Sequence, residues 1–169
     1  MTPTWLEPPL ALARIATRAL EALQPLALLA ARLYVGAAFF RSGLTKIADW
    51  DTTLALFQDE YKVPLLPPHI AALMGTGGEL GLPVLLVLGL FGRFGALGLS
   101  VVNVMAVLSL EEIAPAALSQ HVLWGCLLAA IALWGPGKLS LDAWWWPKLA
   151  GDAAAPAERP MSSARSRAA

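Results

Sequence analysis

The chain has 169 residues, of which 57% are apolar and only 14% charged, and its mean hydropathy is +0.62. A soluble domain usually carries about 25% charged residues, and a compact fold of this size cannot hide so much apolar surface from water. Twelve basic and twelve acidic residues cancel, which argues against a general polyanion binder. The single cysteine, Cys126, excludes an intramolecular disulfide and a C-x-x-C pair. The composition therefore predicts an integral membrane protein.

Four apolar segments approach the roughly 20 residues that a helix needs to cross a bilayer core of about 30 Å. They are residues 25–48, 69–90, 94–110 and 116–134. No convincing cleavage site follows the first apolar run, so we expect this run to be retained as a membrane span. The sequence thus predicts an all-α fold, an integral membrane four-helix bundle, with residues 25–146 as the transmembrane domain.

Residues 1–24 form a separate N-terminal segment. Leu10, Ala13, Thr17 and Leu20 fall on one helical face, with the charged side chains elsewhere. This pattern suits a cytoplasmic amphipathic helix at the membrane surface. A helical extension of the first span explains the segment equally well.

Residues 49–68, between spans one and two, are too polar to cross a membrane. We expect a short interfacial helix there, from about Asp51, a natural N-cap, to Tyr61. After the last span, Gly135, Pro136 and Gly137 end the helix. The tryptophans at 144–146 suit a headgroup belt, and residues 147–169 have the composition of a disordered cytoplasmic tail.

The basic residues predict the orientation of the chain in the membrane. Only Lys46 and Lys62 lie on the side of the 49–68 loop, whereas the side of both termini holds Arg14, Arg18, Arg93, Lys138, Lys148, Arg159, Arg165 and Arg167. The positive-inside rule then places both termini in the cytoplasm. We therefore expect a multi-pass protein of the bacterial inner membrane.

An ionisable residue within a span is costly unless it is paired, so each one is a candidate for a functional site. In the first span a line of residues recurs at spacings of 4, 3, 4 and 3, within about 40° of one direction. Because glycines mark the face where another backbone approaches, this line should point into the bundle. It consists of Arg32, Gly36, Phe39, Gly43 and Lys46.

Glu79, beside Gly78 and four residues before Pro83, lies near the midplane of the second span. We expect it to pair with Arg32, with Arg41 as the alternative partner. Asn103 in the third span could meet either member of this pair, and His121 lies in the outer third of the fourth span. The predicted buried polar site therefore consists of Arg32, Glu79 and Asn103, with Lys46 and His121 toward the outside.

Two interpretations of this site stay open. The charged pair and the asparagine could simply fix the register of the helices, or the same residues could serve a ligand, a quinone or a proton relay. We expect no metal site, since the chain has only two histidines, and no haem between His69 and His121, since they lie at different depths. Cys126 is expected to be dispensable, as a lone thiol has no resolving partner.

Three stretches resemble the DoxX family. The first is residues 32–47, RLYVGAAFFRSGLTKI; the second is residues 78–83, GELGLP, followed by LGLFGR at 88–93. The third is WGPGKLSLD at 134–142, similar to that family's G-P-G-x-x-S-x-D ending, which includes Asp142. The resemblance covers about residues 28–145. It implies a four-helix inner-membrane protein associated with redox processes, and no catalytic residue can be transferred from it.

The resemblance makes a membrane subunit of a quinone-linked or oxidative-stress redox complex the leading hypothesis. The chain shows no evident cofactor motif, so electrons would need a partner's cofactor or a bound quinone, and whether the subunit is itself catalytic stays open. A non-enzymatic scaffold or assembly factor for a partner protein is the alternative, and a small-solute carrier is a third. The expected partners are the lipid bilayer and a second protein or copy of the chain, not nucleic acid.

Overall fold

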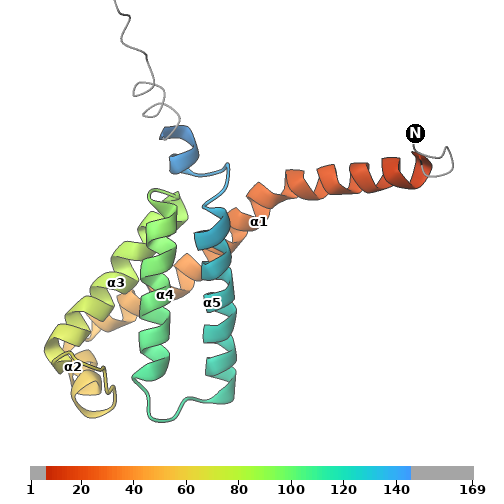
Figure 1. Cartoon of the computed structure of the whole chain (residues 1–169). Coiled ribbons are helices and arrows are strands. Elements are labelled where there is room, and N and C mark those ends of the chain that lie inside the picture. Colours follow the sequence, from red (N-terminus) through yellow and green to blue (C-terminus); the bar gives the residue numbers. More distant parts are fainter. Residues whose placement is uncertain (1–6, 146–169) are drawn as a thin grey trace, which may run out of the picture.

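The computed structural model describes residues 7–145, and the named elements of this part are all α-helices (Figure 1). They are α1 (Glu7–Ala48), α2 (Trp50–Asp59), α3 (Pro68–Leu88), α4 (Gly92–Leu108) and α5 (Pro115–Trp134). The predicted all-α membrane bundle is confirmed. Trp146 and the expected tail at 147–169 lie outside the described residues, as do residues 1–6.

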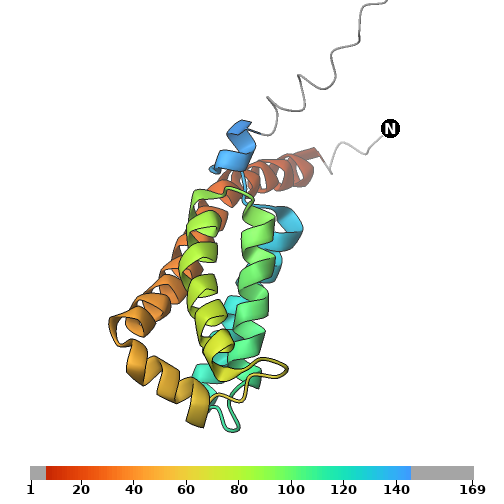
Figure 2. The ribbon, with the colours of Figure 1, turned by 90° about the vertical axis from the view of Figure 1, so that its left-hand side faces the viewer.

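The four longer helices form a ring in the order α1, α3, α4, α5, with α1 closing against α5. Helix α2 packs on α3 and lies across the end of the bundle where α1 ends (Figure 2). The loop at 109–114 lies at this same end, and the tight turn at 89–91 lies at the opposite one, with residues 135–145 (Figure 1). We call these the α2 end and the terminal end.

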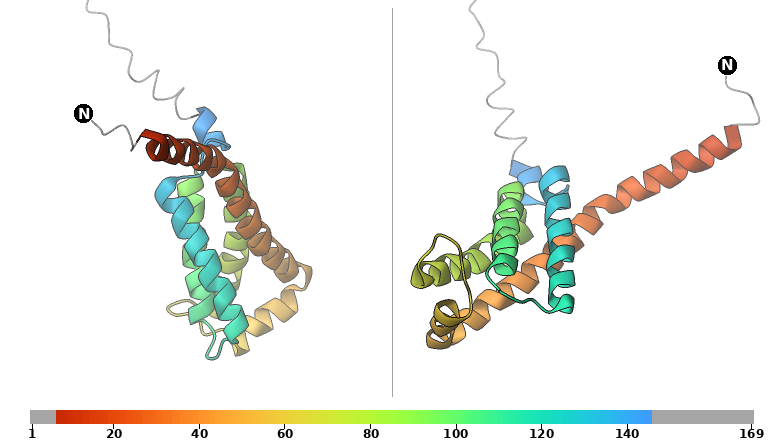
Figure 3. Two further views of the ribbon diagram at one scale, coloured as in Figure 1. Left: turned by 90° about the vertical axis from the view of Figure 1, so that its right-hand side faces the viewer. Right: turned by 60° about the horizontal axis from the view of Figure 1, so that its bottom comes forward.

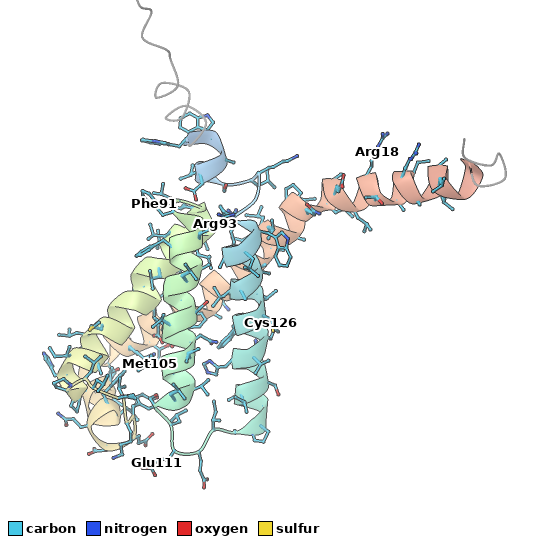
Figure 4. The ribbon with its side chains drawn as sticks, in the orientation of Figure 1. Arg18, Phe91, Arg93, Met105, Glu111 and Cys126 are labelled. Carbon is cyan, nitrogen blue, oxygen red and sulfur yellow. The ribbon has the colours of Figure 1, made fainter. Side chains whose placement is uncertain are left out.

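Three helices are long and apolar enough to cross a membrane, over Leu10–Ala48, Pro68–Leu88 and Pro115–Trp134. The fourth apolar helix, α4, has 17 residues, which corresponds to about 26 Å of helix. It packs between α3 and α5. Many large apolar side chains of these helices are exposed on the outside of the bundle, as expected for a surface in contact with lipid. Cys126 is exposed on α5 and points away from the bundle (Figure 4).

Helix α1 is longer than a span requires. Its 42 residues correspond to about 63 Å, twice the thickness of a bilayer core. The part that packs into the bundle begins near Leu28, which contacts the core, and residues 10–24 extend outside it (Figure 3). Of the two alternatives for the N-terminal segment, the structure shows the helical extension of the first span. Pro25 lies inside this continuous helix.

The helix starts and ends follow local chemistry. Proline occupies the first helical position of α3 and α5, where no backbone donor is needed. Gly89 ends α3 in the left-handed conformation, with φ of 64°. The side chain of Asp49, not the expected Asp51, caps α2 by accepting a hydrogen bond from the Thr52 backbone N–H. This bond lowers the pKa of the Asp49 carboxyl, and the Thr52 hydroxyl adds to the effect.

Helices α1 and α3 approach each other at glycines. A Cβ added to Gly36 would clash with Val87, and one added to Gly43 would lie 2.8 Å from Leu80 Cγ and 3.2 Å from the Glu79 carbonyl carbon. The core beside this contact contains a set of buried apolar side chains: Val35, Phe39, Leu86, Ala96, Leu99, Leu128 and Ile131. Close backbone approach therefore joins the two helices that carry the charged residues.

We expect Gly43→Ala to destabilise the protein by about 1–3 kcal/mol, the usual cost of inserting a methyl group into a packed contact. Gly81→Ala in α3 is the matched control, because a Cβ there meets nothing within 4 Å. The measurement is thermal unfolding in detergent. A Gly43→Ala variant as stable as the Gly81→Ala variant would contradict the close contact of α1 and α3.

Candidate functional site

A buried ion pair joins α1 to α3. The Lys46 ammonium donates to a carboxylate oxygen of Glu79 at 2.6 Å and to the Ser42 hydroxyl at 2.9 Å. Glu79 is 7% exposed, and the Lys46 side chain 20%. Each charge thus has its counter-charge at hydrogen-bond distance, which offsets the cost of removing both from water.

The predicted pair of Arg32 with Glu79 is wrong, and Arg41 does not replace Arg32 in it. Arg32 is buried at the terminal end, where its guanidinium donates to the Leu139 carbonyl and lies in the field of Asp142. Arg41 is exposed on the outer face of α1. Arg32 is therefore part of a second polar cluster, separate from Lys46 and Glu79.

The register of α1 against α3 explains this outcome. Gly43 lies beside Glu79 and Leu80, and Gly36 beside Pro83 and Val87. Continuing this antiparallel register places Lys46, one turn after Gly43, within reach of Glu79. It places Arg32 beside Gly89, and these two residues are in contact. If both helices began and ended in the same plane, Arg32 would lie nearer to Glu79. Helix α3 instead extends past the end of α1, and α2 packs against this overhang.

Asn103 and His121 form a further polar contact, which joins α4 to α5. The Asn103 side chain donates to the His121 backbone carbonyl at 2.9 Å, and its oxygen lies 2.8 Å from Nδ1 of the His121 ring. Because an amide oxygen can only accept, this network assigns the proton to Nδ1. Nε2 then remains as the acceptor of the neutral ring. Asn103 thus orients His121 and makes no hydrogen bond to Glu79 or Arg32.

A cavity of about 510 Å³ brings Lys46, Glu79 and His121 together in the half of the bundle toward the α2 end. All five helices contribute to its wall, and Met105 marks its level on α4 (Figure 4). Besides the three ionisable groups, its polar lining comes from Ser42, Tyr61 and Ser109. The rest is apolar and mostly aliphatic, and it also includes Phe39, Phe57, Met74, Met105 and Trp124. A chamber of this kind suits an apolar molecule with a few polar atoms.

Helix α2 and the segment after it cover the cavity. Phe57 and Tyr61 contact each other edge to face, with ring centroids 5.0 Å apart, and both line the cavity. The Lys62 backbone N–H donates to the Ser109 carbonyl at 2.7 Å, which ties this segment to the end of α4. Burial raises the pKa of the Tyr61 phenol, and the negative charges of Glu60 and Glu79 add to the effect. Tyr61 therefore keeps its proton and can donate a hydrogen bond.

The glycine- and proline-rich segment that follows α5 stabilises the terminal end of the bundle. Both carboxylate oxygens of Asp142 accept hydrogen bonds at 2.8 Å, from the backbone N–H groups of Phe91 and Gly92 at the start of α4. Its own backbone N–H donates to the Gly89 carbonyl at 2.9 Å. Gly135 and Gly137 have φ of 86° and 83°, a region that favours glycine, and Pro136 packs on Gly92. Asp142 thus caps α4 from a distant part of the chain.

Gly78 and Pro83 also lie at helix contacts. A Cβ on Gly78 would lie 3.1 Å from Val102 of α4, and Pro83 is fully buried against α1. Among residues 7–145, no three His, Cys, Asp or Glu side chains gather closely enough to hold a metal ion. The site residues predicted from the sequence therefore fall into three groups, which lie at helix contacts, in the cluster at the terminal end and around the cavity.

Comparison with family models adds an independent observation. The model of the family described as DoxX matches residues 27–112, about half of the chain. The chain belongs to the DoxX family. The matched segment begins near the point where α1 enters the bundle and ends just after α4, so it includes Lys46, Glu79 and Asn103. Comparisons with curated proteins and with solved structures gave no match.

Sequence reasoning missed several side chains of the cavity. Ser42 precedes Lys46 by four residues, a spacing that places both on one helical face and could have indicated their contact. Trp124 follows His121 by three residues and Tyr61 follows Phe57 by four, spacings that indicate contacts within each segment. That these side chains line one cavity could not be predicted, because it depends on how α2 and α5 pack on the bundle. Trp124 contacts both Phe39 and His121, with centroids 5.3 and 5.0 Å apart.

The ion pair predicts an energetic coupling between Lys46 and Glu79. We expect Lys46→Met and Glu79→Gln each to destabilise the protein, and the double variant to be more stable than additivity predicts by about 1–3 kcal/mol. Thermal unfolding of the four proteins in detergent measures this. The control is the cycle of Arg32→Met with Glu79→Gln, which should be additive within about 0.5 kcal/mol. Coupling in the control cycle alone would contradict the observed pairing.

The cap on α4 predicts that Asp142→Ala costs about 1–2 kcal/mol, as for the loss of other N-caps, because two backbone donors lose their acceptor. Asp142→Asn should cost less, since its amide oxygen can still accept one bond. Asp59→Ala, at an exposed site on α2, is the control and should change the unfolding temperature little. Equal stability of the Asp142→Ala and Asp59→Ala variants would show that the cap contributes nothing.

Proposed function

We propose that this DoxX-family protein is the membrane subunit of a quinone-linked redox complex, and that its cavity binds the quinone head. The observation that carries this proposal is an apolar chamber inside a membrane bundle with Lys46 and His121 on its wall. A quinone is an apolar ring with two carbonyl acceptors, and it takes up two electrons and two protons when reduced. Apolar walls with a few donors suit such a head group.

The side chains around the cavity have distinct tasks in this proposal. Glu79 and Ser42 hold the Lys46 ammonium in place, so that its remaining N–H can donate to a carbonyl oxygen. Asn103 holds His121 with Nε2 as acceptor. Nε2 can then accept a proton from a hydroxyl group or, once protonated, donate one to an oxygen. Aromatic side chains and α2 surround these groups.

The electrons would be supplied by a second protein, the partner that a redox subunit of this kind is expected to bind.

We further propose that the protein lies in the inner membrane of a bacterium with both termini in the cytoplasm. The charge distribution supports this orientation, because the described basic residues outside the bundle core at the terminal end include Arg14, Arg18, Arg93 and Lys138. Glu111 and Glu112 are instead in the loop at the α2 end (Figure 4).

A binding titration tests the proposal. The full chain in detergent or nanodiscs is titrated with a short-chain ubiquinone, and quenching of tryptophan fluorescence is followed, since Trp124 lines the cavity. We expect saturable binding that weakens about tenfold in His121→Phe, the effect of losing one hydrogen bond of about 1.4 kcal/mol. His69→Phe is the matched control, because His69 is exposed at the start of α3 and outside the cavity.

Thermal unfolding of both variants shows whether each is folded before binding is compared. Quenching that does not saturate, or equal weakening by both histidine substitutions, would exclude quinone binding in this cavity. A protein that binds no quinone and is purified in a stable complex with another protein would favour the scaffold hypothesis instead.

A further inference from the structure

The part of α1 outside the bundle has two chemically different faces. At about 100° per residue, Arg14, Thr17, Arg18, Glu21 and Gln24 fall within a sector of about 120°. Opposite them lie large apolar side chains that are exposed in the structure: Leu12 69%, Ile15 64%, Leu20 66% and Leu23 56%. Of the face expected from the sequence, Leu20 belongs to this apolar face, whereas Leu10 and Thr17 fall within the polar sector.

The apolar face continues along α1 into the span. Leu26, Leu33 and Leu44 fall in the same sector as Ile15 by helical periodicity, and they are 56%, 47% and 43% exposed on the outside of the bundle. In the span this surface is the one in contact with lipid. The extension thus prolongs a surface of the bundle that lipid already covers.

The position of the extension matches this surface. Residues 10–24, about 22 Å of helix, leave the bundle sideways at the terminal end, near the level of the turn at 89–91 (Figures 1 and 3). Arg18 points up, away from the level of the bundle (Figure 4). Leu20, about 160° from Arg18 around the helix, must then face the side on which the bilayer lies.

We propose that residues 10–24 lie in the plane of the membrane surface, with Leu12, Leu20 and Leu23 inserted into the lipid layer. Amphipathic helices of this kind sink their apolar face about 5–10 Å below the headgroup boundary. Residues 10–24 carry Arg14, Arg18 and Glu21, a net charge of only +1. Insertion therefore rests on apolar burial and needs no anionic lipid. This inference is independent of the quinone site.

Spin labels on a matched pair of sites test the proposal. Cys126→Ser provides the background, and Leu20→Cys and Arg18→Cys each carry one nitroxide on the full chain in phosphatidylcholine nanodiscs. Accessibility to oxygen and to a water-soluble nickel complex reports the depth of each label. We expect the label at 20 about 5–10 Å below the headgroup boundary and the label at 18 in water. Adding phosphatidylglycerol should change neither depth.

Three results would overturn the proposal. Equal exposure of both labels to the nickel complex would mean that the extension projects into water. Dipolar broadening between labels at 20 on two copies, lost on dilution with unlabelled protein, would assign the apolar face to a second copy of the chain. Insertion that requires phosphatidylglycerol would mean that charge, not the apolar face, holds the helix.

Discussion

The ion pair of Lys46 with Glu79 is the interaction on which the half of the bundle toward the α2 end depends. A lysine or glutamate inside a membrane protein is tolerated only with a partner, and these two come from helices that run in opposite directions. Gly43, one turn before Lys46, lets the two backbones approach closely enough for the side chains to meet. The pair in turn forms one polar wall of the cavity. Removing either charge would leave the other without a counter-charge in a mostly apolar chamber.

The two ends of the bundle are built differently. At the terminal end, Arg32 and Asp142 hold backbone groups of the chain directly, so polar side chains there serve the fold. Toward the α2 end, the polar side chains surround open space, and α2 covers it. Structural and candidate functional residues are therefore separated along the bundle axis. This separation is why substitutions at Asp142 and at His121 can be expected to affect stability and binding, respectively.

The extension of α1 adds a further difference between the ends. The extension of α1 leaves the terminal end with an apolar face on one side and a polar face on the other. A helix held in the surface plane would fix the tilt of the span with which it is continuous. The same helix carries Lys46 near its other end, where the contacts of Gly36 and Gly43 set its offset against α3.

The sequence by itself determined the fold class, the approximate limits of the helices and the inward face of α1, because composition and helical periodicity act locally along the chain. It also identified Glu79 and Asn103 as buried polar groups, since polar residues in apolar segments are few, whereas His121 is only partly buried. Arg32 and Lys46 share that inward face, and periodicity cannot tell which of them meets Glu79. Only the tertiary structure decided this, because the offset between α1 and α3 is set by contacts of Gly36 and Gly43 with residues more than thirty positions away.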